Sequence, residues 1–219
     1  MIALADVGTR VGTDAGEAMS GTAGDDILRG FGGADTLRGQ LGADVLRGDT
    51  GGDELSGGDG NDHLDGKIGR DLLQGERGSD TLLAGSGDDT LVGGLGADAL
   101  VGGAGHDVFV FRSGFESSGS DRDILKADTA ALAFDAPGVT VGDVIDLSRV
   151  DADVTTSGDQ AFAWSGLSPG GTGTLWLSRN GALTLVNGNI DSDAVIEFQL
   201  MIEDGSAAAS AYKVQDFVL

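Results

Sequence analysis

Ten aspartates recur at intervals of nine residues in the first half of the chain, and their type and spacing are suited to binding a cation. They are Asp26, Asp35, Asp44, Asp53, Asp62, Asp71, Asp80, Asp89, Asp98 and Asp107. The chain has 36 acidic and 13 basic residues and a formal net charge of −23. This charge argues against nucleic acid or an anionic membrane as a partner, because both require a basic surface. It favours cations instead.

The aspartates belong to a nine-residue repeat that fills residues 21–110 in ten consecutive copies. Position 4 is Gly and position 6 is Asp in every copy, while position 8 is Leu in nine copies and Phe109 in the last. Position 1 is Gly except at Ala84. The last three positions predict a short strand with one inward side chain. The first six predict a turn in which glycine permits positive φ.

Two such repeats would make one coil of a solenoid, so turns n and n+2 would stack at strand spacing, about 4.8 Å. The aspartates of alternate repeats then form two rows, one at each edge. Two carboxylates about 5 Å apart repel by roughly 3 kcal/mol at an effective dielectric constant near 20. Carboxylate and carbonyl oxygens are hard ligands that favour calcium over zinc or copper. The spacing therefore predicts stacked calcium sites.

This pattern, GGxGxDxUx, resembles the repeats-in-toxin (RTX) motif, which implies an all-β, right-handed parallel β-roll that binds calcium. The resemblance implies an ion between turns n and n+2, held by both aspartates and by carbonyls of positions 1 to 4. At the first site the implied ligands are Thr22 O, Gly24 O, Asp26, Gly39 O, Leu41 O and Asp44. The implied position-4 carbonyls along the tract are those of Gly24, Gly33, Gly42, Gly51, Gly60, Gly69, Gly78 and Gly87. Ten turns form eight such pairs, so about eight ions are expected.

Three residues depart from the family pattern: Arg70 and His106 at position 5, and Arg77 at position 3. We expect their side chains to point outward, although Arg70 could weaken the neighbouring site. The alternative is a metal-free solenoid whose aspartates cap turns, but capping alone does not demand Asp in every copy. Residues 12–20 fit the same frame, with Glu17 at position 6. They are interpreted either as a degenerate capping coil within an N-terminal segment, 1–20, or as a tail with chance similarity.

The second half, residues 111–219, loses the glycine period and alternates polar and apolar residues in several segments. The segments predicted as strands are Val141–Leu147, Gly173–Ser178, Ala182–Val186 and Ala194–Ile202. We expect a C-terminal β-sandwich-like domain that continues the β-roll and packs against it as one body. Asn187, Asn189, Asp191 and Asp193 form an oxygen-rich stretch that is either a further calcium site or an Asx-rich turn.

This half resembles the C-terminal domain of serralysin-type metalloproteases. The stretches that carry the resemblance are Asp107–Phe111, Asp146–Ser148, Asp151–Asp153, Gln160–Phe162, Asn189–Asp193 and Asp216–Leu219. An acidic residue followed by three apolar ones at the C-terminus resembles the family's type I secretion signal, which an ABC exporter reads. Residues 1–20 lack the apolar run of a Sec-type signal peptide, so export would need such a different signal.

The resemblance to proteases does not extend to catalysis. A zincin needs HExxH, whereas the chain has only two histidines, His63 and His106. His63 is expected to face outward on a strand and His106 to lie in a turn, so neither is expected in a water-excluding site. The absence of cysteine excludes disulfides and thiolate metal sites. No apolar run approaches the roughly 20 residues of a membrane span.

We therefore expect a secreted calcium-binding module that folds on calcium binding outside the cell and is not an enzyme. The alternatives are a calcium-dependent carbohydrate-binding or adhesion module, as in alginate epimerase accessory modules, or the tail of a larger secreted enzyme. Arg29, Arg38 and Arg47 at position 9 would then be candidates to bind an acidic polysaccharide, although a solvated strand face is the simpler interpretation.

Overall fold

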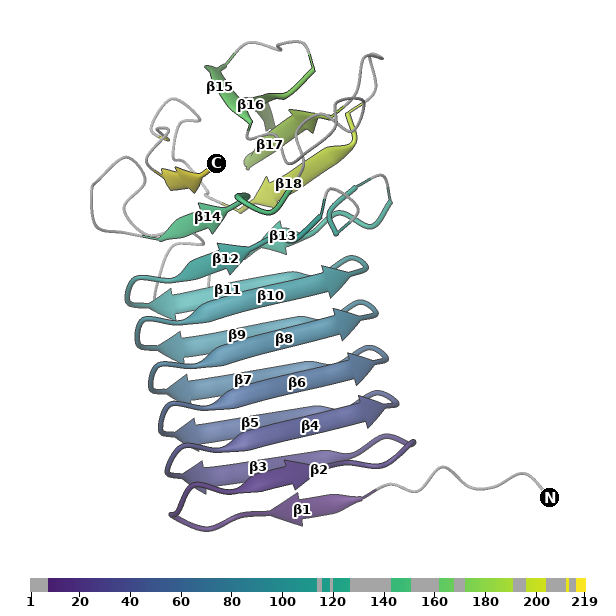
Figure 1. Cartoon of the computed structure of the whole chain (residues 1–219), viewed down its shortest axis with the longest axis vertical. Helices are drawn as coiled ribbons and strands as arrows, with labels where there is room; N and C mark the ends of the chain where they lie inside the picture. The colour runs from purple at the N-terminus through teal and green to yellow at the C-terminus, as the bar shows by residue number, and fades with distance from the viewer. Residues whose placement is uncertain are drawn as a thin grey trace, which may run out of the picture.

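The computed structural model shows an all-β chain in which two sheets run along the long axis and are joined by short turns at both edges (Figure 1). The structure describes residues 8–113, 116–118, 120–126, 143–150, 162–167, 172–190, 196–203, 212 and 216–219. Within this part of the chain there is no α-helix, and hence none that could cross a membrane.

Nine strands of six residues form the body of the molecule. They are β3 (Ile27–Gly32), β4 (Thr36–Leu41), β5 (Val45–Thr50), β6 (Glu54–Asp59), β7 (His63–Ile68), β8 (Leu72–Arg77), β9 (Thr81–Ser86), β10 (Thr90–Leu95) and β11 (Ala99–Ala104). Odd-numbered strands lie in one sheet and even-numbered strands in the other. Each pairs in parallel with the strand two ahead, so that Leu28 lies beside Leu46. The predicted parallel β-roll is confirmed.

The position-8 side chains fill the space between the two sheets. All of them are 0% exposed: Leu28, Leu37, Leu46, Leu55, Leu64, Leu73, Leu82, Leu91, Leu100 and Phe109. Burying one leucine side chain stabilises a fold by about 1.5–3 kcal/mol. This column, to which each repeat contributes one apolar side chain, is therefore the main source of hydrophobic stabilisation in the roll.

The predicted boundaries of strand and turn within each repeat were wrong. Each strand covers positions 7–9 and then positions 1–3 of the next repeat, which leaves only positions 4–6 as the turn. The strand pairing skips position 1. Arg29 pairs with Arg47 and Phe31 pairs with Asp49, but Gly30, which lies between them, is not part of the register. The register offset is the same on both sides of Gly30, and position 2 takes a positive φ, 76° at Phe31, even where it is not glycine.

The N-terminal end of the roll is formed by β1 (Thr9–Val11) and β2 (Ala18–Ser20). Met19 pairs with Leu37 and packs against the leucine core, as a position-8 residue would. The N–H of Glu17 donates to Asp35 Oδ1 at 2.7 Å. Residues 12–20 thus occupy the place of a coil, with Glu17 where the repeats have aspartate.

The C-terminal strands are β12 (Val108–Val110), β13 (Ile124–Leu125), β14 (Val144–Asp146), β15 (Ala163–Gly166), β16 (Thr174–Asn180), β17 (Leu183–Asn189), β18 (Phe198–Ile202) and β19 (Phe217–Val218). After β11, one sheet continues as β13-β18-β17-β16-β15, and the other continues from β10 as β12-β14-β19. The four segments predicted as strands overlap β14, β16, β17 and β18, but their bounds differ from those observed. The expected sandwich is not confirmed, because the described strands extend the two sheets of the roll.

Candidate metal centre

The ten repeat aspartates lie in two rows, one at each edge of the roll, where the three-residue turns stack (Figure 1). Within a row, each aspartate N–H up to those of Asp80 and Asp89 donates to the carboxylate of the aspartate 18 residues ahead. Asp26 N–H donates to Asp44 Oδ1 at 2.6 Å, and Asp44 N–H donates to Asp62 Oδ1 at 2.8 Å. The other row repeats this bond from Asp35 to Asp53 and onward. One carboxylate oxygen of each aspartate is therefore used by the fold.

The second carboxylate oxygen of the aspartate has no hydrogen-bond partner in nearly every turn. Oδ2 is buried and has no hydrogen-bond partner in Asp35, Asp44, Asp53, Asp62, Asp71, Asp80, Asp89, Asp98 and Asp107. These side chains are at most 3% exposed. A buried carboxylate oxygen without a donor is costly, since it has lost water and gained nothing. A bound cation would satisfy it.

The glycines at position 1 keep open the space onto which these oxygens converge. A Cβ on Gly39 would lie 2.2 Å from Asp44 Oδ2 and 2.5 Å from Gly57 O, a carbonyl of β6 two repeats ahead. At Gly75 the corresponding distances are 2.3 Å to Asp80 Oδ2 and 2.5 Å to the next such carbonyl. Carboxylate and carbonyl oxygens that approach one point form a hard donor set, which fits calcium.

The position-4 carbonyls lie directly over the position-4 glycine two repeats ahead. A Cβ on Gly60 would come within 1.8 Å of Gly42 O, and one on Gly78 within 1.7 Å of Gly60 O. The same close approach occurs for the carbonyls of Gly33, Gly51, Gly69, Gly78 and Gly87, while Gly24 O would lie 2.8 Å from a Cβ on Gly42. Backbone crowding of this kind explains why position 4 is glycine in the nine copies from Gly33 to Gly105.

At the first predicted site, the structure brings some of the expected ligands together. Asp26 Oδ2 and Gly39 O both lie within 3 Å of the point where a Cβ on Gly21 would sit. Thr22 O is instead 3.5 Å from Leu41 N. Asp26 Oδ2 also accepts bonds from the N–H and hydroxyl of Thr22, at 2.5 and 2.9 Å. This terminal turn is better satisfied without a cation than the inner turns are.

The electrostatics of the rows change along the roll. Burial raises the pKa of the inner carboxyls, against the opposing effect of the N–H donors, and neighbouring aspartates raise several of them further. The values are about 6 for Asp62, Asp89 and Asp98, and about 7 for Asp71, Asp80 and Asp107. Burial opposes ionisation of Asp26 too, but the Thr22 donors hold its pKa below the ordinary value.

In the described part of the chain, no three His, Cys, Asp or Glu side chains are grouped so that they could hold a metal. Two aspartates per site are therefore the most that side chains supply within the rows. Backbone carbonyls must supply the remaining ligands, and calcium commonly accepts carbonyl oxygens.

Two aspartates that extend the rows were missed by the sequence reasoning. Asp123 Oδ1 accepts the N–H of Asp98 at 2.9 Å, and Asp143 Oδ1 accepts the N–H of Asp107 at 2.9 Å. Each begins an Asp-x-apolar triplet like positions 6–8, ending in Leu125 or in Ile145. This triplet is the sequence signal that could have identified the two aspartates, but they lie beyond residue 110, where the glycine period ends.

The three residues that depart from the family pattern are exposed. Arg70 lies at the surface of its turn. Arg77 Nε is 4.0 Å from Asp59 Oδ1, and His106 Nδ1 is 3.3 Å from Asp88 Oδ1. None of these side chains points into the space between stacked aspartates.

The other candidate residues have structural partners. Asn187 lies within β17, where its amide donates to Ser178 Oγ at 3.0 Å and accepts from Gln199 Nε2 at 2.6 Å. Asn189 is also in β17, so neither asparagine lies in a turn. Asp191 and Asp193, like Asp151–Asp153 and Gln160, lie outside the described residues. His63 lies on β7 beside Val45 and is half-buried.

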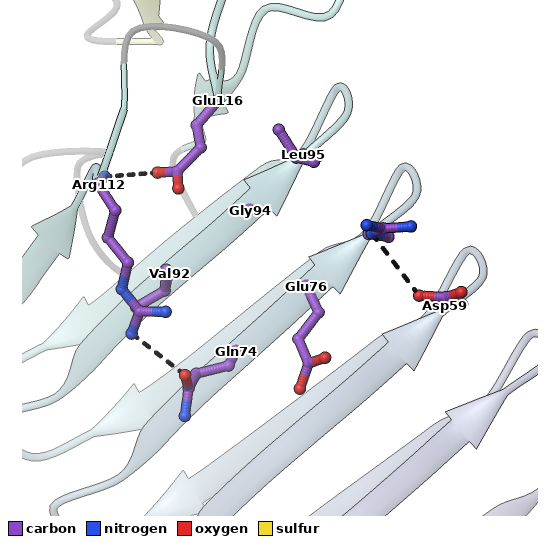
Figure 2. Close-up of a pocket in the computed structure, with 9 residues that line it drawn as sticks. Asp59, Gln74, Glu76, Val92, Gly94, Leu95, Arg112 and Glu116 are labelled. Atoms are coloured by element: carbon purple, nitrogen blue, oxygen red, sulfur yellow. Dashed lines mark hydrogen bonds and ion pairs between the residues drawn. The ribbon is translucent and has the colours of Figure 1, made fainter. Parts of the chain in front are cut away.

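A groove of about 350 Å³ lies over β8 and β10 on the outer face of the eight-stranded sheet (Figure 2). Arg112 crosses it, donating from Nη2 to Gln74 Oε1 at 3.2 Å, while its backbone N–H donates to Glu116 Oε2 at 2.6 Å. Val92 and Leu95 contribute apolar surface. Neither histidine lines this groove, so it offers no imidazole for acid–base chemistry.

Comparison with known proteins agrees with this geometry. The family model for the RTX calcium-binding nonapeptide repeat (4 copies) matches residues 11–46, 39–73 and 74–109. No curated protein matches the chain.

The solved structures that are similar to the chain include an epimerase subunit and a lipase. The AlgE6R3 subunit of the Azotobacter vinelandii mannuronan C5-epimerase is 20% identical, with 94% of this chain and 80% of that one covered and a TM-score of 0.28. The extracellular lipase LipA of Serratia marcescens is 15% identical, with a TM-score of 0.30. The match covers 96% of this chain but only 40% of the lipase.

The stacked aspartates, the glycine-lined turns and the match of the family model agree with one another. Residues 11–109 match the model of the RTX calcium-binding nonapeptide repeat, so this part of the chain carries RTX repeats.

Proposed function

We propose that the chain is a folding module in which the two rows of aspartates bind calcium and the roll forms only when they do. The observation that carries this proposal is the recurring buried Oδ2 without a donor. Asp44 and Asp62 illustrate it, since Oδ1 of each accepts a backbone N–H and Oδ2 of each is left to bind an ion.

The mechanism is coupled binding and folding. Without calcium the stacked carboxylates repel, and the glycine-rich repeats have little core beyond one column of apolar side chains to oppose their conformational entropy. With calcium the binding free energy becomes folding free energy. About eight ions would add roughly +16 to a chain of net charge −23. Sites of the extracellular class, with dissociation constants of roughly 10⁻⁴–10⁻³ M, would stay empty in the cytosol and fill outside the cell.

A calcium titration of chelator-treated protein at neutral pH tests this proposal. Far-ultraviolet circular dichroism should change from an unordered spectrum to a β spectrum as calcium is added, and gel filtration should show compaction. Magnesium at the same concentrations should have little effect, because it requires small, near-ideal octahedral sites. Strand content that chelation leaves unchanged would contradict the switch.

We further propose that the unfolded chain leaves the cell through a type I exporter that reads Asp216–Leu219. In the folded protein Asp216 is 2% exposed, and Phe217 lies in β19 beside Ile145 of β14. Such a segment is accessible to an exporter only before folding. The low calcium of the cytosol would keep it accessible.

Co-expression with a type I exporter tests the export step. Deletion of residues 216–219 should retain the protein in the cells, while the intact chain appears in the medium. The purified deletion variant serves as the control, and calcium should still drive formation of its repeats. Equal export of both forms would contradict this part of the proposal.

We propose no catalytic role for the described residues, because His106 pairs with Asp88 and His63 lies on a strand face. Binding of an acidic polysaccharide is not favoured either. Arg29 and Arg47, which were candidates for it, both pair with Asp49 at 2.5 Å. Whether the chain works alone or as the tail of a larger secreted enzyme is tested by the intact mass of the native secreted species.

A further inference from the structure

The row that contains Asp98 continues beyond the last nonapeptide. Asp98 N–H donates to Asp123 Oδ1 at 2.9 Å, the same bond by which Asp80 N–H donates to Asp98 Oδ1 at 2.8 Å. The spacing is 25 residues instead of 18. The parallel register also continues, since Ala99 pairs with Ile124 in the next strand.

Asp123 is as deeply buried as any aspartate in the repeats. Its side chain is 0% exposed and its Oδ2 has no hydrogen-bond partner, while Asp98, 1% exposed, also has an Oδ2 without a partner. Glu116, 8% exposed, adds a further negative charge that acts on both. Two buried carboxylates at one junction, each with an oxygen that lacks a donor, are costly without a cation.

We propose that Asp98 and Asp123 hold a calcium ion that lies outside the nonapeptide tract and joins it to the C-terminal strands. This inference rests on the proposed calcium function of the repeats and extends it to a site that the nine-residue period does not contain. Asp143 stands in the same relation to Asp107 in the other row. The rows therefore provide about ten stacked aspartate pairs, compared with about eight in the repeats alone.

The contacts of Asp123 explain what this ion would control. Asp123 O accepts the N–H of Met201 at 3.0 Å, and Asp123 N–H donates to Ser117 Oγ at 2.9 Å. Ser117 Oγ in turn donates to Gln199 O at 2.8 Å. Met201 and Gln199 belong to β18, the strand through which β17, β16 and β15 join the sheet. Calcium at Asp98 and Asp123 would thus stabilise the docking of this C-terminal part on the roll.

The test compares Asp123→Asn with Asp121→Asn in the full-length protein. Asp121 is exposed and two residues away, so its variant makes the same charge change without touching the row. Native mass spectrometry at saturating calcium should show about one ion fewer for Asp123→Asn only. Hydrogen exchange should show at least roughly tenfold faster exchange in β18 of that variant, with β5 and β7 unchanged. An ion count and β18 protection equal to those of the wild type would overturn the inference.

The outcomes separate this inference from the function on which it rests. If the wild type binds no calcium, both are wrong. If Asp62→Asn loses ions while Asp123→Asn loses none, only the junction site is wrong. Should Asp123→Asn fail to fold, wild-type crystals grown with calcium decide the matter. An anomalous difference peak between Asp98 and Asp123 supports the site, and peaks confined to the repeats overturn it.

Discussion

Asp44 and Asp62 are joined by one hydrogen bond, from Asp44 N–H to Asp62 Oδ1 at 2.8 Å, while Oδ2 of both carboxylates has no partner. The same half-satisfied arrangement recurs along both edges of the roll. The fold thus aligns like charges and leaves half of each carboxylate for something positive. Under the proposed function, this relationship would link the stability of the roll to calcium, and each prediction below tests part of that link.

The first prediction concerns a carboxylate that two neighbouring sites would share. Asp62 lies between Asp44 and Asp80 in its row, so Asp62→Asn should lower the calcium stoichiometry by about two ions. The calcium concentration at half folding should rise by roughly tenfold, the equivalent of about 1.4 kcal/mol. Asp59→Asn is the matched control, since the Asp59 side chain is 56% exposed. Equal midpoints for the two variants in a dichroism titration would contradict shared sites.

The second prediction concerns the space kept open by position-1 glycine. A methyl group at Gly66 would lie 2.5 Å from Asp71 Oδ2 and 2.7 Å from Ala84 O, so Gly66→Ala should weaken calcium binding. A cost of about 1–3 kcal/mol is typical of such overpacking. Ala84→Gly, which removes the one alanine at this position, should have the opposite effect. Calorimetric titration measures both.

Gly52→Ala is the control for this pair, because its Cβ would meet only Arg70 O, at 3.2 Å. The variant should bind calcium as the wild type does. A loss of affinity as large as that of Gly66→Ala would show that glycine content matters in general, and not the space at position 1.

The third prediction concerns pH in the absence of metal. Burial raises the pKa of Asp71 and Asp107 from 3.8 to about 7 in the folded chain, so the folded state binds protons that the unfolded state releases. Stability from these groups is fully present below about pH 4 and is lost as pH rises through about 7. Calcium-free protein should therefore contain more strand at pH 5 than at pH 8 by circular dichroism. Strand content that increases with pH would contradict this sign.

The fourth prediction concerns the leucine column. Leu64 is 0% exposed, and Leu64→Ala should destabilise the calcium-bound protein by about 2–5 kcal/mol. Ile68, at the end of the same strand, is 60% exposed, and Ile68→Ala should change stability little. Urea unfolding at saturating calcium measures both. Similar midpoints would mean that ions alone support the roll.

Much of the roll could be predicted from the sequence because each repeat imposes the same local constraints. An inward residue such as Leu46 and a turn residue such as Asp44 recur with a period of nine, and only a stacked arrangement satisfies both. The strand bounds were harder to predict. Phe31 adopts a positive φ of 76° that its residue type does not favour. The parallel pairing of Arg29 and Phe31 with β5, on either side of Gly30, imposes this conformation.

The sequence by itself determined the solenoid, its inner leucines and the two rows of aspartate. A repeat with one inward apolar residue in every nine can bury that residue in few ways other than by stacking the repeats. Only the tertiary structure decided that Asp123 and Asp143 extend those rows. Their positions depend on parallel pairing of β13 with β11 and of β14 with β12 across intervening segments of irregular length. Long-range pairing of this kind has no period, so no local pattern reveals which distant carboxylate will meet Asp98.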